Sequence, residues 1–448
     1  MAALPLLIGC AAGFSGDRTD VAAPVVRTLI ERGGPAFLVY ETLAERTLAL
    51  AQLARRGNPA GGYEPQLDAL LRPVLADCLR HGIRIVGNFG AANPEGAAAR
   101  IAALARELGL AVPRIAVIAG DDLSAPAYRP LLRSRVGAAF DRLDVLCANA
   151  YIGADSLVDA LDAGAQVVVA GRIADPTLAV APARAHFGWA ADEWDRIARA
   201  TMAGHLLECG AQVTGGYFAD PGYKDVPGLA TLGFPIAQIE AGGDCVIGKA
   251  SRTGGVVSLQ TVKEQLLYEV HDPSAYLTPD VVADLSAAEL QQVAPDEVAL
   301  RGVRGHPRPE GLKVNIFHEG GWLAEGEISY AGPGAERRAR LAADILRQRL
   351  GGLRLRIDLI GVVSILGDDD GGLLRATPAR AARDVRLRVA AAHEDREAAG
   401  QLLHEVGALY TCGPAGGGGV RTAMRARLNT LSCIVPRDQV KTSYRMID

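Results

Sequence analysis

The sequence predicts an α/β protein with a Rossmann-like, doubly wound and mainly parallel sheet, followed by an α+β domain. Short, wholly apolar runs alternate with amphipathic helical patterns along the first half of the chain, as in parallel sheets covered on both faces. From about residue 221, glycine and proline become denser and strand and helix patterns mix. With 448 residues, 49% of them apolar, the chain can build more than one core. We therefore expect a Rossmann-like domain at residues 1–220, an α+β domain at 221–448 and a cleft between them.

Each predicted element of the first domain follows from one of these two patterns. The apolar strand candidates are residues 4–10, 36–40, 83–88, 114–119, 145–148 and 166–170. The helical patterns between them cover residues 20–31, 43–55, 65–80, 95–108 and 156–163. Because the carboxyl ends of parallel strands share one edge of the sheet, the loops after these strands are expected to surround a ligand site.

The second domain is predicted to mix antiparallel strands with two helices. Residues 412–421 are predicted to form a glycine loop with four successive glycines, and its part at 413–419 could act as a nest for an anion or as a mobile lid. The amphipathic helices are at 334–350 and 396–410. The strand candidates are residues 244–248, 255–260, 297–303, 312–317, 324–330, 353–363 and 385–389.

Composition and charge restrict the class of protein. The formal net charge is −4 without a basic tail, so neither nucleic acid nor a membrane surface is an expected partner. No apolar run reaches the length of about 18 residues that spans a bilayer, and the apolar first residues lack the basic segment of a signal peptide. The seven cysteines are scattered without CxxC spacing, which is typical of free thiols in a reducing compartment. We expect a cytoplasmic protein that forms homo-oligomers.

The loop after the first predicted strand, at residues 9–18, could bind an anion. It ends in the pair Asp17 and Arg18. Its glycines have GxxxGxxG spacing instead of the GxGxxG spacing of dinucleotide-binding loops, so no nicotinamide or flavin cofactor is expected. The loop and Arg18 could hold a substrate carboxylate or a CoA phosphate. The alternative is a structural turn with an internal ion pair.

Later loops offer amide and guanidinium groups. Asn88 and Asn93 follow the third predicted strand, and Asn149 lies in the loop after the fifth. Side-chain amides there could stabilise an enolate or oxyanion oxygen, although asparagine also serves simply to form tight turns. Arg172 and Asp175 follow the sixth strand in the sequence GRIADP. Arg172 is either a two-pronged clamp for a substrate carboxylate or one half of a buried ion pair.

The segment GHLLECGAQVTGG, at residues 204–216, is predicted to be a short helix that runs into a paired-glycine turn. One side of this helix is apolar, and polar groups fall within an arc of about 100° on the other. The polar residues are His205, Glu208, Cys209 and Gln212. They suit acid–base catalysis by His205 and Glu208, covalent catalysis by Cys209, or metal ligation by His205, Glu208 and Cys209. A polar seam between domains is the structural alternative.

Six long segments of the chain are distinctive: GFSGDR at 13–18, NFGAANP at 88–94, ANAYIGAD at 148–155, VVVAGRIADP at 167–176, ECGAQVTGG at 208–216 and KEQLLYEVHDPSAYLTPDVVADL at 263–285. Together they resemble the acyclic terpene utilisation (AtuA-like) family. The small C-terminal domain with an SGDKG-type motif that members often carry has no counterpart in this sequence. The resemblance implies a role in the breakdown of acyclic terpenes such as citronellol and geraniol through branched acyl-CoA intermediates.

Together these features predict a lyase or hydratase that acts on a small or CoA-linked carboxylic acid, with no cofactor or metal of its own. Arg172 or Arg18 would hold the carboxylate or phosphate. Asn88 and Asn93 would stabilise an enolate oxygen, and Glu208 or His205 would move the proton. CoA would enter only as part of the substrate. Two alternatives are a hydrolase or acyl transferase with Cys209 as nucleophile, and a non-catalytic accessory protein of an acyl-CoA carboxylase pathway.

Overall fold

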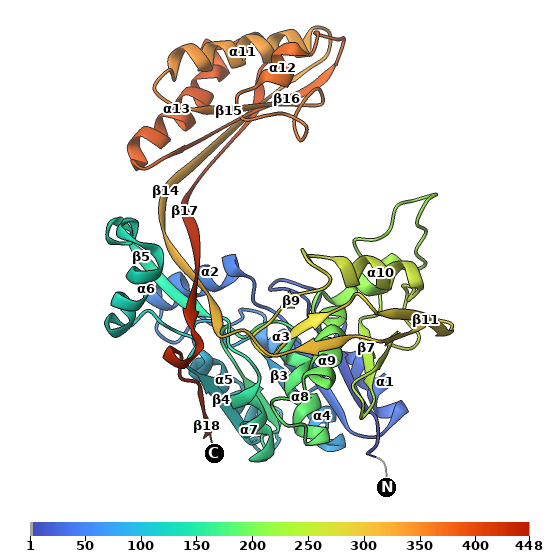
Figure 1. Ribbon diagram of the computed structural model, residues 1–448. Coiled ribbons are helices and arrows are strands. Elements are labelled where there is room, and N and C mark those ends of the chain that lie inside the picture. Colours follow the sequence, from blue (N-terminus) through green and yellow to red (C-terminus); the bar gives the residue numbers. More distant parts are fainter. Residues whose placement is uncertain (1–2, 448) are drawn as a thin grey trace. The chain divides into compact units, whose positions relative to one another are not determined.

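The computed structural model describes residues 3–447, which form two compact units (Figure 1). The first unit comprises the chain up to Phe317 together with the stretch that starts at Thr430, and the second comprises His318–Asn429. Each unit has its own hydrophobic core. The predicted boundary near residue 220 falls inside the first unit. Among the helices of residues 3–447, none is both long and apolar enough to cross a lipid bilayer.

The central sheet of the first unit has a parallel centre. Five strands run parallel and neighbour one another in the order β1-β2-β3-β6-β4. Their residues are apolar and buried almost throughout, as expected for strands covered on both faces. The five strands are β1 (Leu6–Cys10), β2 (Ala36–Tyr40), β3 (Arg84–Gly87), β6 (Val167–Val169) and β4 (Ile115–Ala119).

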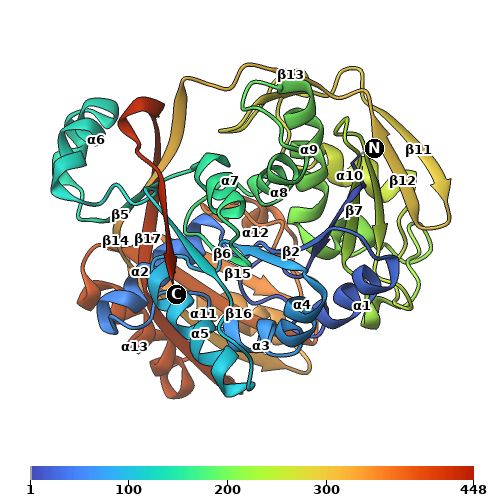
Figure 2. The ribbon, with the colours of Figure 1, turned by 90° about the horizontal axis from the view of Figure 1, so that it is seen from below.

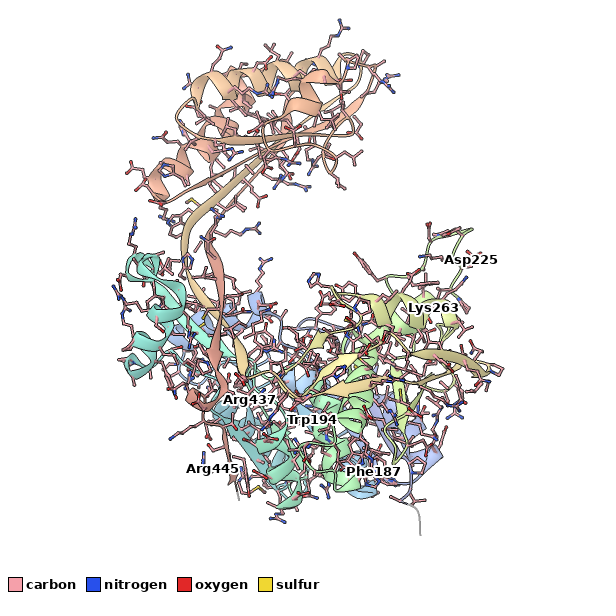
Figure 3. All side chains as sticks on the ribbon, viewed as in Figure 1. Phe187, Trp194, Asp225, Lys263, Arg437 and Arg445 are labelled. Atoms are coloured by element: carbon pink, nitrogen blue, oxygen red, sulfur yellow. The ribbon has the colours of Figure 1, made fainter. Side chains whose placement is uncertain are left out.

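Antiparallel strands extend this sheet at both edges. β7 pairs with β1, and β8, β12 and β11 continue outward from it. At the opposite edge β18 pairs with β4, and its Arg445, labelled in Figure 3, forms an ion pair with Glu95. A separate three-stranded sheet has the order β13-β10-β9. These strands are β7 (Pro235–Ile239), β8 (Cys245–Lys249), β9 (Tyr276–Leu277), β10 (Val282–Asp284), β11 (Glu289–Ala294), β12 (Glu297–Arg301), β13 (Arg304–His306) and β18 (Ser443–Ile447).

The sheet departs from the predicted Rossmann arrangement in two ways. β5 (Val145–Ala150) pairs with β14 (Gly311–Ala331) and takes no place among the parallel strands. β1 has antiparallel β7 as one neighbour, whereas the first strand of a Rossmann sheet lies between parallel strands. The run VLCANA in β5 is as apolar as the other strands, so its periodicity does not identify its partner. The first unit is therefore a mixed α/β structure with a parallel centre and antiparallel edges.

Helices cover both faces of the parallel strands (Figure 2). On one face α7 packs against α8 and α8 against α9, and both α8 and α9 contact β1. On the other face α1, α4 and α5 contact β1, β3 and β4 respectively. These helices are α1 (Ala22–Arg32), α4 (Leu75–His81), α5 (Pro94–Glu107), α7 (Asp155–Asp162), α8 (Thr177–Phe187) and α9 (Trp194–Glu208). The unit also contains α2 (Glu45–Gly57), α3 (Leu67–Leu71), α6 (Arg129–Val136) and α10 (Leu259–Leu267).

Some predicted elements of the first unit are wrong for local reasons. The helix predicted at 65–80 is interrupted around Pro73, which lacks a backbone N–H, and forms α3 and α4 instead. Residues 255–260 form no strand, because Ser258 caps α10 and accepts a hydrogen bond from the Thr261 amide. The sequence also does not reveal α8, since its nearly all-buried segment TLAVAPARAHF lacks the polar face that marks an amphipathic helix.

The second unit has a βαββαβ topology with one additional short helix. Its strand order is β15-β16-β14-β17, and β16 is antiparallel to both β14 and β15, as in a ferredoxin-like fold. The strands predicted at 312–317 and 324–330 are parts of the single strand β14, which continues through Gly321 with a φ of 76°. Both α11 and α13 pack against β16. The remaining elements are α11 (Ala335–Arg349), β15 (Leu355–Ile360), α12 (Gly372–Ala376), β16 (Asp384–His393), α13 (Arg396–Cys412) and β17 (Gly418–Pro436).

Candidate active site

The first unit contains a cavity of about 990 Å³. Its wall is built by the loops after β1, β2, β5 and β6, by the end of α9 and the residues up to Tyr217, by parts of residues 268–279 and 309–313, and by Ile434. The lining residues come from both sides of the predicted boundary near residue 220, and all belong to the first unit. Arg437, labelled in Figure 3, donates hydrogen bonds to the backbone oxygens of Pro279 and Pro309 and so holds two wall segments together.

Acidic side chains outnumber cationic ones in the cavity wall, and several aromatic rings lie among them. Six carboxyl groups line it against two cationic groups, Arg172 and Lys313. Such a wall suits a neutral, apolar molecule, or one that develops positive charge, better than it suits an anion. The carboxyl groups belong to Asp17, Glu41, Glu45, Asp175, Glu208 and Glu269. The aromatic rings belong to Phe14, Tyr151, Tyr217, Tyr268 and Tyr276.

The predicted polar stripe is not one continuous helix face. α9 starts at Trp194, labelled in Figure 3, and ends at Glu208. Gly210 has a φ of 54°, a left-handed conformation that stops the helix, and residues Gly210–Thr214 form a separate 3-10 turn, η3. Thus His205 and Glu208 lie on the last turn of α9, whereas Cys209 caps the helix and Gln212 belongs to η3. Of these four residues, all but His205 line the cavity.

His205 and Glu208 form a buried, hydrogen-bonded pair. Nδ1 of His205 lies 3.0 Å from Oε1 of Glu208, and Nε2 lies 2.9 Å from the backbone oxygen of Gln265 on α10. A carbonyl oxygen only accepts hydrogen bonds, so Nε2 carries a proton. Nδ1 and the Glu208 carboxyl group therefore share one further proton, as imidazolium and carboxylate or as imidazole and carboxylic acid.

Burial brings the titration of this pair toward neutral pH. Desolvation raises the pKa of Glu208 to about 7, although His205 opposes the shift. Desolvation lowers the pKa of His205, but the Glu208 carboxylate outweighs it, and the net pKa lies above the ordinary value. Oε2 of Glu208 has no hydrogen-bond partner within residues 3–447. A cavity-lining carboxyl group that titrates near neutrality and has one unbonded oxygen can both give and take a proton.

Cys209 lines the cavity without an activating partner. Burial, and then the Glu208 carboxylate, raises the pKa of its thiol to about 12. Both ring nitrogens of His205 are already bonded, to Glu208 and to Gln265. The thiol is therefore protonated at neutral pH and has no base beside it. Across residues 3–447, no three His, Cys, Asp or Glu side chains are grouped as a metal-binding set.

Of the predicted pair after β1, only Asp17 reaches the cavity. Its carboxylate accepts hydrogen bonds from the Gly13 and Arg18 amides at 2.9 and 2.7 Å, and burial raises its pKa. The Arg18 guanidinium is bonded elsewhere, to Asp20 at 2.6 Å and to the backbone oxygen of Ala230 at 2.9 Å. The ion pair of Arg18 is thus formed with Asp20, which lies outside the loop at 9–18, and not with Asp17 as in the predicted structural turn.

The buried Arg172 forms an ion pair with the partly exposed Asp175 beside the cavity. Arg172 is 1% exposed, and its guanidinium pairs with Asp175. The same group donates to the backbone oxygens of Ile173 and Leu43, and the Tyr151 ring centre lies 4.5 Å from its Cζ. All three nitrogens of Arg172 therefore have acceptors, and the side chain ties the loops after β2, β5 and β6 together. A substrate carboxylate would have to displace Asp175 to bind there.

The three predicted asparagines are not among the lining residues. Asn93 caps α5, and its Oδ1 accepts a hydrogen bond from the amide three residues along the chain at 3.0 Å. Asn149 donates to Asp121 at 3.0 Å. Asn88 is fully buried and donates to Glu41 at 2.8 Å. These amides position neighbouring groups, and the predicted enolate-binding role of Asn88 and Asn93 finds no support in the geometry.

Glu41, directly after β2, is a cavity residue that the sequence analysis did not single out. It is 6% exposed, and its Oε1 accepts hydrogen bonds from Nδ2 of Asn88 and from the Leu43 amide, both at 2.8 Å. Burial, and then the charge of Asp175, raises its pKa to about 8. The available signal was a carboxyl group immediately after a wholly apolar strand, in the sequence YETLAER.

A second polar cluster surrounds Tyr151. Its hydroxyl group donates to Oε1 of Glu45 at 2.6 Å, and Lys313 and Asn315 approach the same oxygen at 3.3 and 3.2 Å. Burial alone would raise the pKa of Glu45, but the Tyr151 hydrogen bond and the Lys313 charge lower it to about 2. Glu45 is therefore ionised, and the charge of Lys313 is already matched by a carboxylate.

Two further wall residues, Tyr217 and Glu269, have left-handed backbone conformations, with φ of 59° and 58°. For residues other than glycine this conformation costs about 1 kcal/mol or more, and such strain clusters at functional sites. The sequence carries no signal for it, because neither residue type favours positive φ.

Comparison with known proteins gives the family of the chain. A search of the curated proteins finds no match. A family model described as acyclic terpene utilisation family protein AtuA matches residues 6–446, and this range includes every residue that lines the cavity. The chain therefore belongs to the acyclic terpene utilisation (AtuA) family.

Proposed function

We propose that this protein is an acid–base enzyme of the lyase or hydratase class that acts on an acyclic terpenoid or its branched acyl derivative. The observation that carries the proposal is the His205–Glu208 pair beside the cavity. The pair shares one proton, the pKa of Glu208 is about 7, and one carboxyl oxygen has no partner within residues 3–447. The link of the family to acyclic terpene utilisation supplies the substrate class.

The size and chemistry of the cavity support this substrate class. A volume of about 990 Å³ is ample for a branched chain of roughly ten carbons, since ligand pockets generally span about 300–1,000 Å³. Tyr151, Tyr268 and Tyr276 present rings that can bury an apolar chain. The acidic groups favour the developing positive charge of a protonated double bond over a fixed negative charge.

Addition or removal of water at a carbon–carbon double bond needs only such a pair. In elimination, Glu208 takes a proton from the carbon next to the one that bears the hydroxyl group. The hydroxyl group leaves with a proton from the pair, so that a C–H and a C–O bond break, a C=C bond forms and water is released. Hydration is the reverse. The pair begins and ends the turnover with the same single proton, and no electrons are exchanged with a cofactor.

Some of the predicted binding residues line the cavity wall, and others lie outside it. We assign Arg172 to holding the loops and not to the substrate, because its donors are occupied. CoA enters the proposal only as a carrier joined to the acyl group. The predicted residues that line the wall and remain proposed contacts are Asp17, Asp175 and Gln212. Those outside the wall, which we do not assign to the substrate, are Arg18, Asn88, Asn93 and Asn149.

Neither alternative function has a specific supporting observation. A nucleophilic Cys209 needs a thiolate, and its thiol has a pKa of about 12 with no base beside it. An accessory protein whose polar stripe is a packed seam predicts no cavity there, whereas Glu208, Cys209 and Gln212 line one. The cytoplasmic location and the homo-oligomeric state remain predictions from the sequence.

Deuterium incorporation tests the proposal without knowledge of the product. The purified protein is incubated in D₂O with the geranic acid thioester of N-acetylcysteamine and, separately, with geraniol. Mass spectrometry follows the deuterium and water added to each. We expect incorporation into at least one of them, and we expect Glu208→Gln to slow it by about a hundredfold or more because the proton carrier is removed.

The matched control is Glu397→Gln, which makes the same chemical change at an exposed position on α13 of the second unit. We expect it to retain the wild-type rate. Absence of incorporation into both compounds contradicts the proposal, as does incorporation that Glu208→Gln leaves unchanged.

A further inference from the structure

The carboxyl group of Glu41 is held in one orientation at the cavity wall. Its Oε1 accepts two hydrogen bonds of 2.8 Å, from Nδ2 of Asn88 and from the Leu43 amide. Its Oε2 has no hydrogen-bond partner within residues 3–447, although the residue is 6% exposed and lines the cavity. Oε1 is thus committed to the protein, and Oε2 is the oxygen left to meet a bound molecule.

The orientation of Asn88 is itself determined by a backbone donor. The Thr42 amide donates to Oδ1 of Asn88 at 2.8 Å, and a backbone N–H can face only an acceptor. Nδ2 of Asn88 must therefore point the other way, toward Oε1 of Glu41. Because Oε1 faces two N–H donors, a proton on this carboxyl group resides on Oε2.

Besides burial, the two nearest charges act on Glu41 in opposite directions: the Asp175 carboxylate raises its pKa, and the Arg172 guanidinium lowers it by less. The guanidinium is bonded to Asp175 and to the backbone oxygens of Ile173 and Leu43, and within residues 3–447 it forms no ion pair with Glu41. Cys10 at the end of β1 and Cys209 after α9 also lie close enough to interact, and burial raises the pKa of both thiols, which keeps them neutral. Burial and the Asp175 charge raise the pKa of Glu41 to about 8, which places its proton on the group at neutral pH.

We propose that Glu41 donates a hydrogen bond from Oε2 to an uncharged oxygen of the substrate, and that the cavity thereby selects a thioester, aldehyde or alcohol over a free carboxylate. This inference rests on the proposed function for the reaction and adds the chemical form of the substrate. Asn88 acts as the positioning residue, because it holds Oε1 and so directs Oε2. The predicted recognition of a substrate carboxylate by arginine is replaced by recognition of a neutral oxygen by a carboxylic acid.

The rest of the wall supports the same selection. The two cationic groups that could attract a carboxylate, Arg172 and Lys313, are matched by Asp175 and Glu45. A carbonyl oxygen, in contrast, can accept a hydrogen bond from Glu41 and carries no negative charge that the wall carboxylates would repel. If Glu208 removes a proton next to that carbonyl, negative charge develops on the oxygen, and a preorganised donor stabilises it most at that moment.

Binding of three ten-carbon probes tests the selection directly. Geraniol, geranial and geranate differ only in the oxygen group, and calorimetry measures their affinities below and above pH 8. We expect geranial and geraniol to bind more tightly than geranate at neutral pH, and the affinity for geranial to fall above about pH 8 as Glu41 loses its proton. Geranate that binds as tightly as geranial at neutral pH overturns the proposal.

Two substitutions of Glu41 separate the donor from the charge. Glu41→Gln retains an acceptor for Asn88 and an N–H donor toward the cavity, so we expect geranial affinity within about threefold of wild type and no fall above pH 8. Glu41→Leu removes the donor, and we expect a loss of about threefold to tenfold. Equal geranial affinity of both variants overturns the proposal. Asn88→Ala, which frees Oε1, should weaken geranial binding and leave the folded circular dichroism spectrum in place.

Infrared spectroscopy gives a readout that needs neither ligand nor activity. The wild-type minus Glu41→Gln difference spectrum should show the carbonyl stretch of a protonated carboxyl group, and this band should disappear as the pH rises through about 8. A difference spectrum without that band at neutral pH overturns the proposal. These results are independent of the deuterium experiment: loss of exchange in Glu208→Gln with normal exchange and binding in Glu41→Leu would retain the proposed function and reject the role of Glu41.

Discussion

His205 and Gln265 exchange two hydrogen bonds between α9 and α10. The ring Nε2 of His205 donates to the backbone oxygen of Gln265 at 2.9 Å, and the side-chain amide of Gln265 donates to the backbone oxygen of His205 at 3.1 Å. The bond from Nε2 to the Gln265 backbone leaves Nδ1 as the ring nitrogen that faces Glu208. The bond from the Gln265 side chain helps to hold α10 in the position at which the Nε2 bond can form. The chemistry of the site therefore depends on the packing of these two helices.

The side-chain bond from Gln265 should contribute measurably to stability. Gln265→Met removes the donor to the His205 backbone oxygen at similar volume, so we expect the free energy of unfolding to fall by about 1 kcal/mol. Urea denaturation measures the change, with Gln291→Met on the exposed face of β11 as the control. The backbone oxygen of residue 265 remains, so the pH profile of deuterium incorporation should stay the same. An equal change in the two variants would contradict this account.

Glu41 should make stability depend on pH, and its substitution by glutamine should remove that contribution. Its pKa rises from the ordinary value of 4.5 to about 8, so the folded protein holds this proton more tightly than the unfolded chain does. The free energy of unfolding should therefore fall as the pH rises from about 4.5 through about 8. Glu41→Gln does not titrate and should be more stable than wild type at high pH, by on the order of a few kcal/mol.

Urea denaturation of both proteins from about pH 5 to about pH 9 checks this prediction. Glu208 has a raised pKa as well and gives a slope of the same sign, but it is present in both proteins and cancels in the difference. Parallel stability curves for wild type and Glu41→Gln would show that Glu41 is ionised in the folded protein.

Cys209 should react slowly with thiol reagents and be dispensable for proton transfer. A rise in pKa from 9.0 to about 12 lowers the thiolate fraction about a thousandfold at neutral pH, and the thiolate is the reactive form. Iodoacetamide should therefore label the exposed Cys412 long before Cys209, as measured by peptide mass spectrometry. Cys209→Ser should retain deuterium incorporation. Rapid labelling of Cys209 together with loss of incorporation in Cys209→Ser would favour the nucleophilic alternative.

Arg172 should be needed for the fold of the cavity wall. Arg172→Met leaves Asp175 without its partner and the backbone oxygens of Leu43 and Ile173 without a donor, so we expect a loss of about 3–5 kcal/mol of stability. Arg18→Met removes an exposed pair and should cost about 1 kcal/mol or less. Thermal denaturation compares them, and adding Asp175→Asn to Arg172→Met should recover part of the loss.

Local patterns predict single elements of this fold well but not how they pair. The run at Ala36–Tyr40 is predicted with the bounds of β2, because five apolar residues stand between glycine–proline and polar neighbours. The equally apolar run of β5 pairs with β14, which lies more than 150 residues later in the chain. Strand partners are chosen by contacts distant in sequence, and no periodicity records them.

The site shows the same limit at the level of side chains. Glu208 and Asp175 are predicted and line the cavity, since Glu208 is the last residue of α9 and Asp175 lies in the loop after β6, and both elements end at the cavity wall. Asn88 has the same kind of sequence context, yet the Thr42 amide turns it inward to support Glu41. Whether a polar side chain meets a ligand or its own backbone is decided by hydrogen-bond partners that only the folded chain brings together.

The pairing of β18 with β4 has a consequence during synthesis. These two strands are neighbours in the sheet but are separated by more than three hundred residues, which include the whole second unit. During translation the outer edge of β4 therefore stays unpaired for on the order of tens of seconds. In that time the unpaired β4 edges of nascent chains on the same messenger RNA can associate with one another. A chaperone that shields strand edges would be of most use to this protein in that interval.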